Sequence, residues 1–199
     1  MKKLMIPLLF CFSLAVSVFT ISLLNDRHAL QEELIRLHVV ADSDSEEDQA
    51  LKLQVRDAVL HTIREGMAQA GDAQAARTYL LENLPKIQSA AKNCLRRLGC
   101  EDAVSVTLCK EDFPKRIYDT FALPAGIYEA LRITIGEGQG QNWWCVAFPA
   151  LCVPAVSRDM ETVAADAGFT DSLTGAMTGR YEVRFYLLDL LGRLETARS

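Results

Sequence analysis

Residues 35–59 read IRLHVVADSDSEEDQALKLQVRDAV, and this stretch decides the fold because it joins a strand pattern to a helix pattern. Apolar and polar residues alternate over 35–39, which predicts a strand with one buried face. An acidic turn follows, in which Ser45 and Asp48 form a helix start that resembles a capping box. The apolar positions then recur at helical spacing to about Glu65, and they are Leu51, Val55, Ala58, Val59, Thr62 and Ile63.

A second helical pattern follows the first. Asp72 can cap its start, one apolar face continues to Leu98, and Gly99 is a typical stop. Pro85 interrupts the pattern, so the sequence predicts either two helices or one kinked helix.

Beyond Gly99 the apolar period changes to two, which is typical of strands. The predicted strands are 104–109, 127–135, 143–148 and 181–187. Segment 154–179 is rich in Ala, Thr, Gly and Asp, and we interpret it as a variable loop with a short helix near 159–167. A strand, two helices and several further strands predict an α+β domain. We expect a mostly antiparallel sheet with two or three helices packed on one face.

The N-terminal segment has the pattern of an export signal. Residues 4–24 carry no charge, and this run of 21 residues can cross about 30 Å of hydrocarbon as a helix. Lys2 and Lys3 precede it, so residues 1–24 are predicted to be a signal peptide or an uncleaved signal-anchor helix. The sequence 15–17 offers a cleavage site, whereas the length of the uncharged run favours an anchor.

The exported part is acidic. It comprises a predicted stem over 25–34 and a single domain over 35–199. Without Lys2 and Lys3, 19 basic residues stand against 26 acidic ones, a net charge of about −7. No basic patch with aromatic neighbours occurs, so nucleic acid and anionic lipid are poor partner candidates. The sequence also predicts no cofactor, no metal and no small-molecule substrate.

Five of the six cysteines lie in the exported part, so they cannot all pair with one another. Cys145 and Cys152 flank a short apolar segment, and a disulfide between them is permitted outside the cell. The alternative is that both are buried free thiols. No CxxC pair occurs and no histidine lies near, which disfavours a zinc site.

The acidic run 42–48 and the histidines are the main candidates for chemistry. The run lacks the Gly at position 6 and the Glu at position 12 of an EF-hand loop, so we interpret it as a capped, solvated turn. His28 and His61 each have a Glu four residues on, which is typical of surface pairs. His38 precedes Asp42, and the two can be imagined as an acid–base pair. A hydrogen-bonded strand histidine is the simpler interpretation.

The glycine-rich segment 136–140 leads toward a strand and not into a helix. This context favours a flexible hairpin loop over a phosphate cradle. Trp143 and Trp144 follow it, and successive residues of a strand point to opposite faces. One indole can therefore lie in the core while the other is exposed as a binding anchor. The alternative is that both are largely buried.

Several long blocks resemble a known family. Residues 35–59 strongly resemble the N-terminal block of the stage II sporulation protein R family. Segments 112–114, 123–132 and 136–152 are similar to its later blocks and occur in the same order, and 181–187 fits its terminal strand. The resemblance covers roughly 34–153 and the final strand. The family often has Asn where this chain has Asp42, which argues against an essential carboxylate there.

The resemblance implies a sporulation signal and not an enzyme. Proteins of this family are made in the forespore and exported into the space between forespore and mother cell. There they trigger the sigma-E processing peptidase, a membrane-embedded aspartic protease, which cleaves the pro-sequence from pro-sigma E. The export pattern and the absence of a nucleophile motif agree with this expectation.

Polar and aromatic groups concentrate in the loop 136–144 and the turn 38–48, so we expect the partner to bind there. The candidate residues are His38, Asp42, Asp44, Glu137, Asn142, Trp143 and Trp144. Two alternatives are a peptidoglycan-binding module, in which the tryptophans stack on sugars, and a hydrolase that uses His38 with Asp42.

Overall fold

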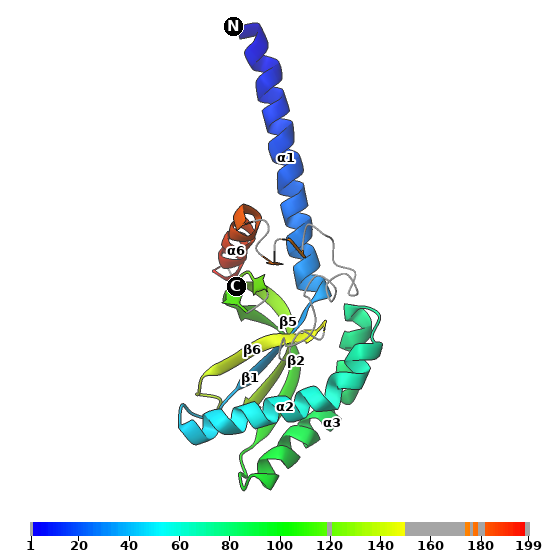
Figure 1. Cartoon of the computed structure of the whole chain (residues 1–199), viewed down its shortest axis with the longest axis vertical. Helices are drawn as coiled ribbons and strands as arrows, with labels where there is room; N and C mark the ends of the chain where they lie inside the picture. Colours follow the sequence, from blue (N-terminus) through cyan, green and yellow to red (C-terminus); the bar gives the residue numbers. More distant parts are fainter. Residues whose placement is uncertain (1, 119–120, 150–173, 176, 179–181, 198–199) are drawn as a thin grey trace.

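The computed structural model describes residues 2–118, 121–149, 174–175, 177–178 and 182–197. A long helix, α1 (Lys2–Glu33), projects from a domain built around a sheet (Figure 1). Between Ile6 and Leu24 its large apolar side chains are mostly exposed, and by length and composition it is able to cross a membrane. The helix continues unbroken through 25–33, the segment expected to be a stem.

The central sheet has four strands in the order β2-β5-β1-β6. β1 (Ile35–Val40) pairs in parallel with β5 (Gly126–Ile135) and antiparallel with β6 (Asn142–Phe148). β2 (Val104–Phe113) pairs antiparallel with β5. A short ribbon of β3 (Arg116–Ile117) and β4 (Ala122–Leu123) lies beside it. The predicted α+β class and the mostly antiparallel sheet are confirmed.

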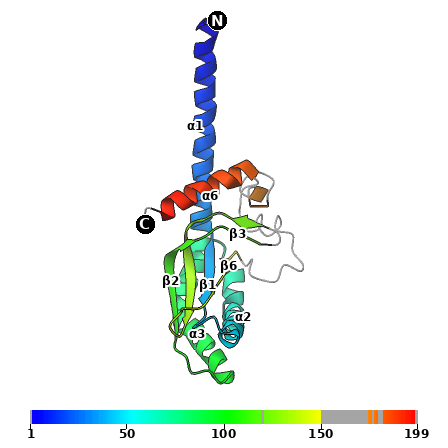
Figure 2. The same cartoon turned by 90° about the vertical axis from the view of Figure 1, so that its left-hand side faces the viewer.

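Two helices cover one face of the sheet, as predicted. They are α2 (Glu46–Gln69) and α3 (Ala73–Arg97), and Figures 1 and 2 show them together on the same side. The side chains of β1 that face them, Ile35, Leu37 and Val39, lie in one core with Val55, Val59, Ile63, Leu80, Ile87 and Leu95. Each such side chain stabilises the fold by about 1.5–3 kcal/mol when it leaves water.

The ends of α2 and α3 follow local chemistry. Ser45 caps α2, because its Oγ accepts a hydrogen bond from the backbone N–H of Asp48 at 3.1 Å, which confirms the predicted start. The helix continues past the predicted end at Glu65 to Gln69, and Gly66 lies within it against Tyr79 of α3, where a β-carbon would overlap the ring. α3 is one continuous helix that contains Pro85, so the alternative of two helices is wrong.

The C-terminal turns of α1 form part of a second core on the other face of the sheet. Leu30 and Leu34 are fully buried there. Their cluster also includes Leu23, Phe113, Phe121, Leu123, Tyr128, Ala130, Val146, Met177 and Leu188. The helix is therefore integrated into the folded domain from about Leu23 onward.

The predicted strand over 181–187 is wrong. The chain forms a helix, α6 (Glu182–Thr196), across the base of α1 (Figure 2). The apolar pattern has a period of two only as far as Leu187. Beyond that point Leu188, Asp189 and Gly192 share the buried side, which is helical spacing. Most of segment 154–179, interpreted as a variable loop, lies outside the described residues, as does its predicted helix near 159–167; the described residues 174–175 and 177 are helical.

Leu30→Ala is expected to lower the free energy of unfolding by about 2–5 kcal/mol, because it opens a cavity in the second core. Leu24→Ala removes the same atoms from an exposed position of the same helix and should change little. Urea unfolding of the full chain in detergent micelles measures both. Equal stabilities would show that α1 does not pack against the domain.

Candidate partner-binding site

Two segments that are far apart in sequence meet at one corner of the domain. The turn after β1 and the loop before β6 are joined by hydrogen bonds from the loop's backbone. The Asp42 carboxylate accepts from Glu137 N at 2.6 Å, and the Asp44 carboxylate accepts from Gln141 N at 2.7 Å. We call residues 41–45 and 136–142 the corner. The two predicted segments therefore form a single surface.

Glycines allow the corner to close. Gly136 and Gly138 have φ values of +57° and +65°, which favour glycine. A β-carbon on Gly136 would overlap the Asp42 carboxylate, and one on Gly140 would overlap the backbone carbonyl of Ser43. The loop therefore packs closely against the acidic turn. The predicted hairpin is wrong, because β1 lies between β5 and β6 in the sheet.

Lys52 of α2 supports the corner from beneath. It is nearly buried, and its Nζ donates to the backbone carbonyl of Gln141 at 2.8 Å and to Gln49 at 2.5 Å. Burial lowers the pKa of this amine, and neighbouring Asp44 opposes that shift. The lysine thus fixes the loop through its backbone and leaves the exposed side chains of the corner available.

A polar cluster continues from the corner onto the sheet face opposite α2 and α3. His38 Nδ1 lies 2.9 Å from Glu111 Oε2, and His38 Nε2 lies 2.7 Å from Asn142 Oδ1. Arg132 forms an ion pair with the same Glu111 carboxylate. His38 and Arg132 are adjacent because β1 and β5 pair in parallel. The cluster connects all four strands of the central sheet and orients Asn142 at the corner.

Glu111 is the charged centre of this cluster. Burial alone would raise its pKa, but hydrogen bonds from His38 and Arg132 outweigh burial and lower the pKa below its ordinary value. The carboxylate is therefore ionised at neutral pH and balances the charge of Arg132.

Because the folded pKa of Glu111 is lowered, its contribution to stability is present above the unfolded carboxyl pKa of about 4.3 and is lost as pH falls through the folded value. Glu111→Gln is therefore expected to lose stability at pH 7 and to show a weaker decline on acidification. Urea midpoints between pH 3 and pH 7 measure this. The exposed Glu65→Gln serves as the control, and an identical acid slope in wild type and Glu111→Gln would contradict the assignment.

The two tryptophans lie on opposite faces of β6, as expected from strand geometry. Trp143 is 37% exposed, and the Arg56 guanidinium of α2 lies 4.4 Å from its ring centroid. Trp144 is half-buried between His38, at a centroid distance of 5.7 Å, and Arg116, at 3.9 Å. Neither indole is fully buried, so both can contribute to a contact surface.

A buried arginine underlies the polar cluster. Arg36 is fully buried, with its guanidinium 4.1 Å from the Phe113 ring centroid and its Nη2 donating to Tyr118 Oη at 2.8 Å. Burial lowers its pKa, and the Tyr118 and Tyr128 side chains oppose that shift. Within the described part of the chain its Nε and Nη1 have no hydrogen-bond partner. Tyr118 connects Arg36 to β6, because Tyr118 Oη also donates a hydrogen bond to the Trp144 carbonyl oxygen at 3.3 Å.

All seven predicted partner-binding residues lie at the corner or directly beside it. Asp44, Glu137, Asn142 and Trp143 are exposed, whereas Asp42 and Trp144 are half-buried and His38 is buried. The pairing of His38 with Asp42 is wrong, because Asp42 binds Glu137 N while His38 binds Glu111. That geometry removes the basis for the imagined acid–base pair.

Three contributing residues were missed from the sequence: Glu111, Arg116 and Arg132. Arg132 lies on the polar row of the strand pattern 127–135, but nothing in the sequence shows that this row lies beside His38. Glu111 and Arg116 lie at the end of β2 and in the short β3, where no apolar pattern assigned a face.

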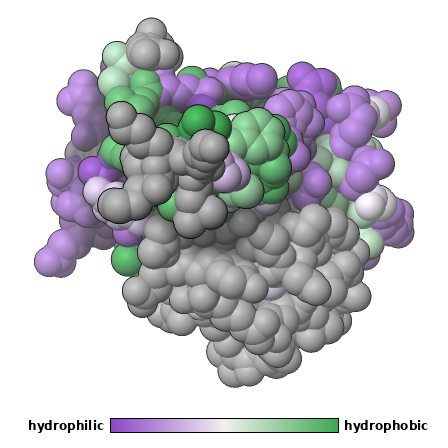
Figure 3. Space-filling model, turned by 90° about the horizontal axis from the view of Figure 1, so that it is seen from above, coloured by the Kyte–Doolittle hydropathy of each residue, from purple (hydrophilic) through white to green (hydrophobic). Residues whose placement is uncertain are grey.

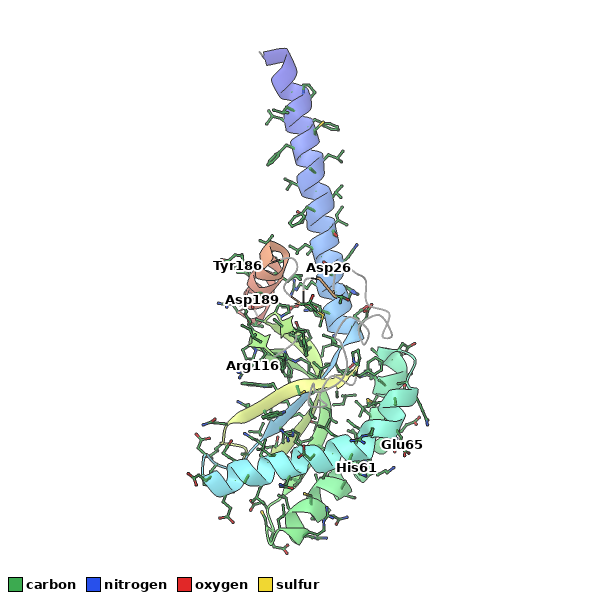
Figure 4. All side chains as sticks on the ribbon, in the orientation of Figure 1. Asp26, His61, Glu65, Arg116, Tyr186 and Asp189 are labelled. Atoms are coloured by element: carbon green, nitrogen blue, oxygen red, sulfur yellow. The ribbon has the colours of Figure 1, made fainter. Side chains whose placement is uncertain are left out.

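The remaining histidines are on the surface. His28 contacts Glu32 at 2.9 Å, and both side chains are exposed. His61 and Glu65 are exposed on α2 (Figure 4). No group of three His, Cys, Asp or Glu side chains in the described ranges is placed to hold a metal ion.

The cysteines divide into two classes. Cys94, Cys100 and Cys109 of the domain are free, and Cys145 is disulfide-bonded. Burial raises the thiol pKa of Cys100 and of Cys109, which disfavours a reactive thiolate. Cys152 lies outside the described residues, so its predicted pairing with Cys145 stays a prediction.

Comparison with known proteins places these features in a family. The profile of the family described as Stage II sporulation protein R matches residues 31–158. Stage II sporulation protein R of Bacillus subtilis (strain 168) is 40% identical over 128 residues, which is 64% of this chain. The match spans 57% of that relative's length, and no solved structure matches. The chain belongs to the stage II sporulation protein R family.

Proposed function

We propose that this protein is an exported sporulation signal that activates the membrane-embedded sigma-E processing peptidase and so leads to cleavage of pro-sigma E. Family membership supports the link to sporulation, and the apolar α1 supports export. With Lys2 and Lys3 retained in the forespore cytoplasm, the domain lies in the space between forespore and mother cell.

The observation that carries the proposal is the corner. β1 starts directly after α1 and runs its full length away from it, about 20 Å for six residues, before it reaches the corner. Figure 1 shows this end of the sheet away from α1. The corner presents polar and aromatic groups at a distance from the protein's own membrane helix. A receptor in a separate membrane can therefore contact them.

Activation needs preferential binding to the active state of the peptidase. Moving a receptor from 1:99 to 99:1 requires about 5.5 kcal/mol of preference. A central aromatic anchor contributes about 2–4 kcal/mol in many interfaces, and satisfied polar contacts add to it. Trp143 provides the anchor, and Asn142, Asp44 and Glu137 provide exposed polar groups around it.

Reconstitution in a non-sporulating host tests the proposal. The chain is co-expressed with the peptidase and pro-sigma E, once with its own N-terminal segment and once with residues 1–21 replaced by a cleavable secretion signal. The second form keeps the docked part of α1 and is free to diffuse. Removal of the pro-sequence, followed by gel, is expected only when the chain is present and exported.

No cleavage with either form would overturn the proposal, provided that the chain is folded and outside and the peptidase responds to a known activator. Binding of the same chain to purified peptidoglycan would then favour the wall-binding alternative.

A further inference from the structure

The outer side of α6 carries an apolar stripe. Tyr186, Leu190 and Leu194 are 66%, 42% and 53% exposed and are spaced four residues apart, so they align along one side of the helix. The opposite side is anchored in the domain, where Leu188 is buried and Asp189 accepts a hydrogen bond from Ala125 N at 3.0 Å. Figure 4 places Tyr186 farther from the sheet than Asp189.

The position of α6 relative to α1 indicates what the apolar stripe contacts. α6 lies crosswise at the base of α1, at the level where α1 leaves the domain (Figures 1 and 2). The uncharged run of α1 ends at Leu24, and the first basic residue after it, Arg27, forms an ion pair with Glu195 of α6. Gln31 also donates to Glu195, at 2.7 Å. The end of the apolar run is therefore tied directly to α6.

We propose that α6 lies on the surface of the membrane that α1 crosses, with Tyr186, Leu190 and Leu194 in the lipid interface. A helix that exposes an apolar side can lie in the plane of a bilayer interface with that side toward the lipid, and the opposite side of α6 is held by the domain. Tyrosine is favoured at the head-group level. Arg193 is exposed and forms an ion pair with Asp189 at 2.9 Å. Viewed along α1, apolar groups lie near the centre of the view, with polar groups above them and to either side (Figure 3).

Lipid is the occupant that the geometry favours over a protein partner. The stripe lies on a helix at the base of α1, whose large apolar side chains are mostly exposed from Ile6 to Leu24 and which is long and apolar enough to cross a membrane. A domain attached by one helix alone would swivel, whereas a second contact at α6 holds the strands upright. The corner then points away from its own membrane, toward a partner on the other side of the intermembrane space. The proposal depends on α1 staying in the membrane and not on the identity of the receptor.

Fluorescence quenching by brominated lipid tests the inference with the full chain in phosphatidylcholine vesicles brominated near the head-group end of the acyl chains. Bromine quenches tryptophan only at close range, and the native Trp143 and Trp144 lie at the corner end of β6. Tyr186→Trp adds an indole to the stripe. Leu98→Trp adds one at an exposed apolar position at the C-terminal end of α3, which Figure 1 places far from α1. Phe19→Trp, within α1, reports insertion.

Tyr186→Trp is expected to lose most of the emission of its added indole, as Phe19→Trp does, while wild type and Leu98→Trp keep theirs. Quenching of Phe19→Trp without quenching of Tyr186→Trp would overturn the proposal and assign the stripe to a protein contact. If Tyr186→Trp alters the circular dichroism spectrum, Leu190→Trp repeats the measurement at the middle of the stripe. No peptidase is present, so the result is independent of the signalling assay.

Discussion

Replacing Trp143 by alanine is expected to abolish cleavage of pro-sigma E while the domain stays folded. The Trp143 indole is partly exposed beside the corner. Within the fold, its removal eliminates chiefly the contact with Arg56, which contributes about 0.5–1 kcal/mol of stability at an exposed site. At an interface, truncation of an aromatic anchor costs 2 kcal/mol or more, about 30-fold in affinity. The pro-sequence gel and a urea unfolding curve measure the two effects separately.

Leu81→Ala is the matched control, since Leu81 is a large apolar residue with similar exposure on α3, away from the corner. It should signal normally. Trp144→Ala should also abolish signalling but at a larger cost in stability, because His38 and Arg116 both pack on that ring. Full signalling by both tryptophan variants would remove the corner from the interface.

Gly140→Ala is expected to reduce signalling by more than tenfold by disturbing the corner without touching its exposed side chains. The added β-carbon overlaps the Ser43 carbonyl, and relieving that overlap costs about 1–3 kcal/mol. The hydrogen bond from Gly140 N to Ala41 O, at 3.0 Å, would be the first to give way. Amide hydrogen exchange over 136–142 should increase while exchange in α3 stays slow.

Gly71→Ala provides the comparison, because a β-carbon there meets no atom within 4 Å and the backbone needs no positive φ. It should leave both signalling and exchange unchanged. Unaltered exchange at the corner in Gly140→Ala would show that the loop accommodates the methyl group and is not a fitted partner of the acidic turn.

Sequence patterns predicted the elements in which the apolar pattern continues over many residues and the ends carry capping residues. β1, α2 and α3 were found this way, because Ser45 caps α2 and the strand and helix faces both pack into one core. α6 was missed because its first residues also fit a period of two, and only Leu188 and Gly192 distinguish the helix. Short windows cannot separate the two periods when apolar residues are dense.

The candidate site was predictable in location but not in its chemistry. The turn 38–48 and the loop 136–144 are polar and aromatic in sequence, and they do meet. The partners of His38 were not predictable, because they depend on which strands become neighbours. The parallel pairing of β1 with β5 brings Arg132 beside His38 and lets Glu111 reach both. Sequence proximity suggested Asp42 instead, which is committed to Glu137 N.

The most direct test of the account is photo-cross-linking between the corner and the peptidase. A benzophenone amino acid is placed at exposed Gln139, within the corner, and separately at exposed His61 on α2. Both proteins must still trigger cleavage of pro-sigma E. The account predicts a cross-linked product with the peptidase from position 139 and none from position 61. Cross-linking from position 61 alone, with position 139 silent in an active protein, would show that the receptor binds elsewhere on the domain.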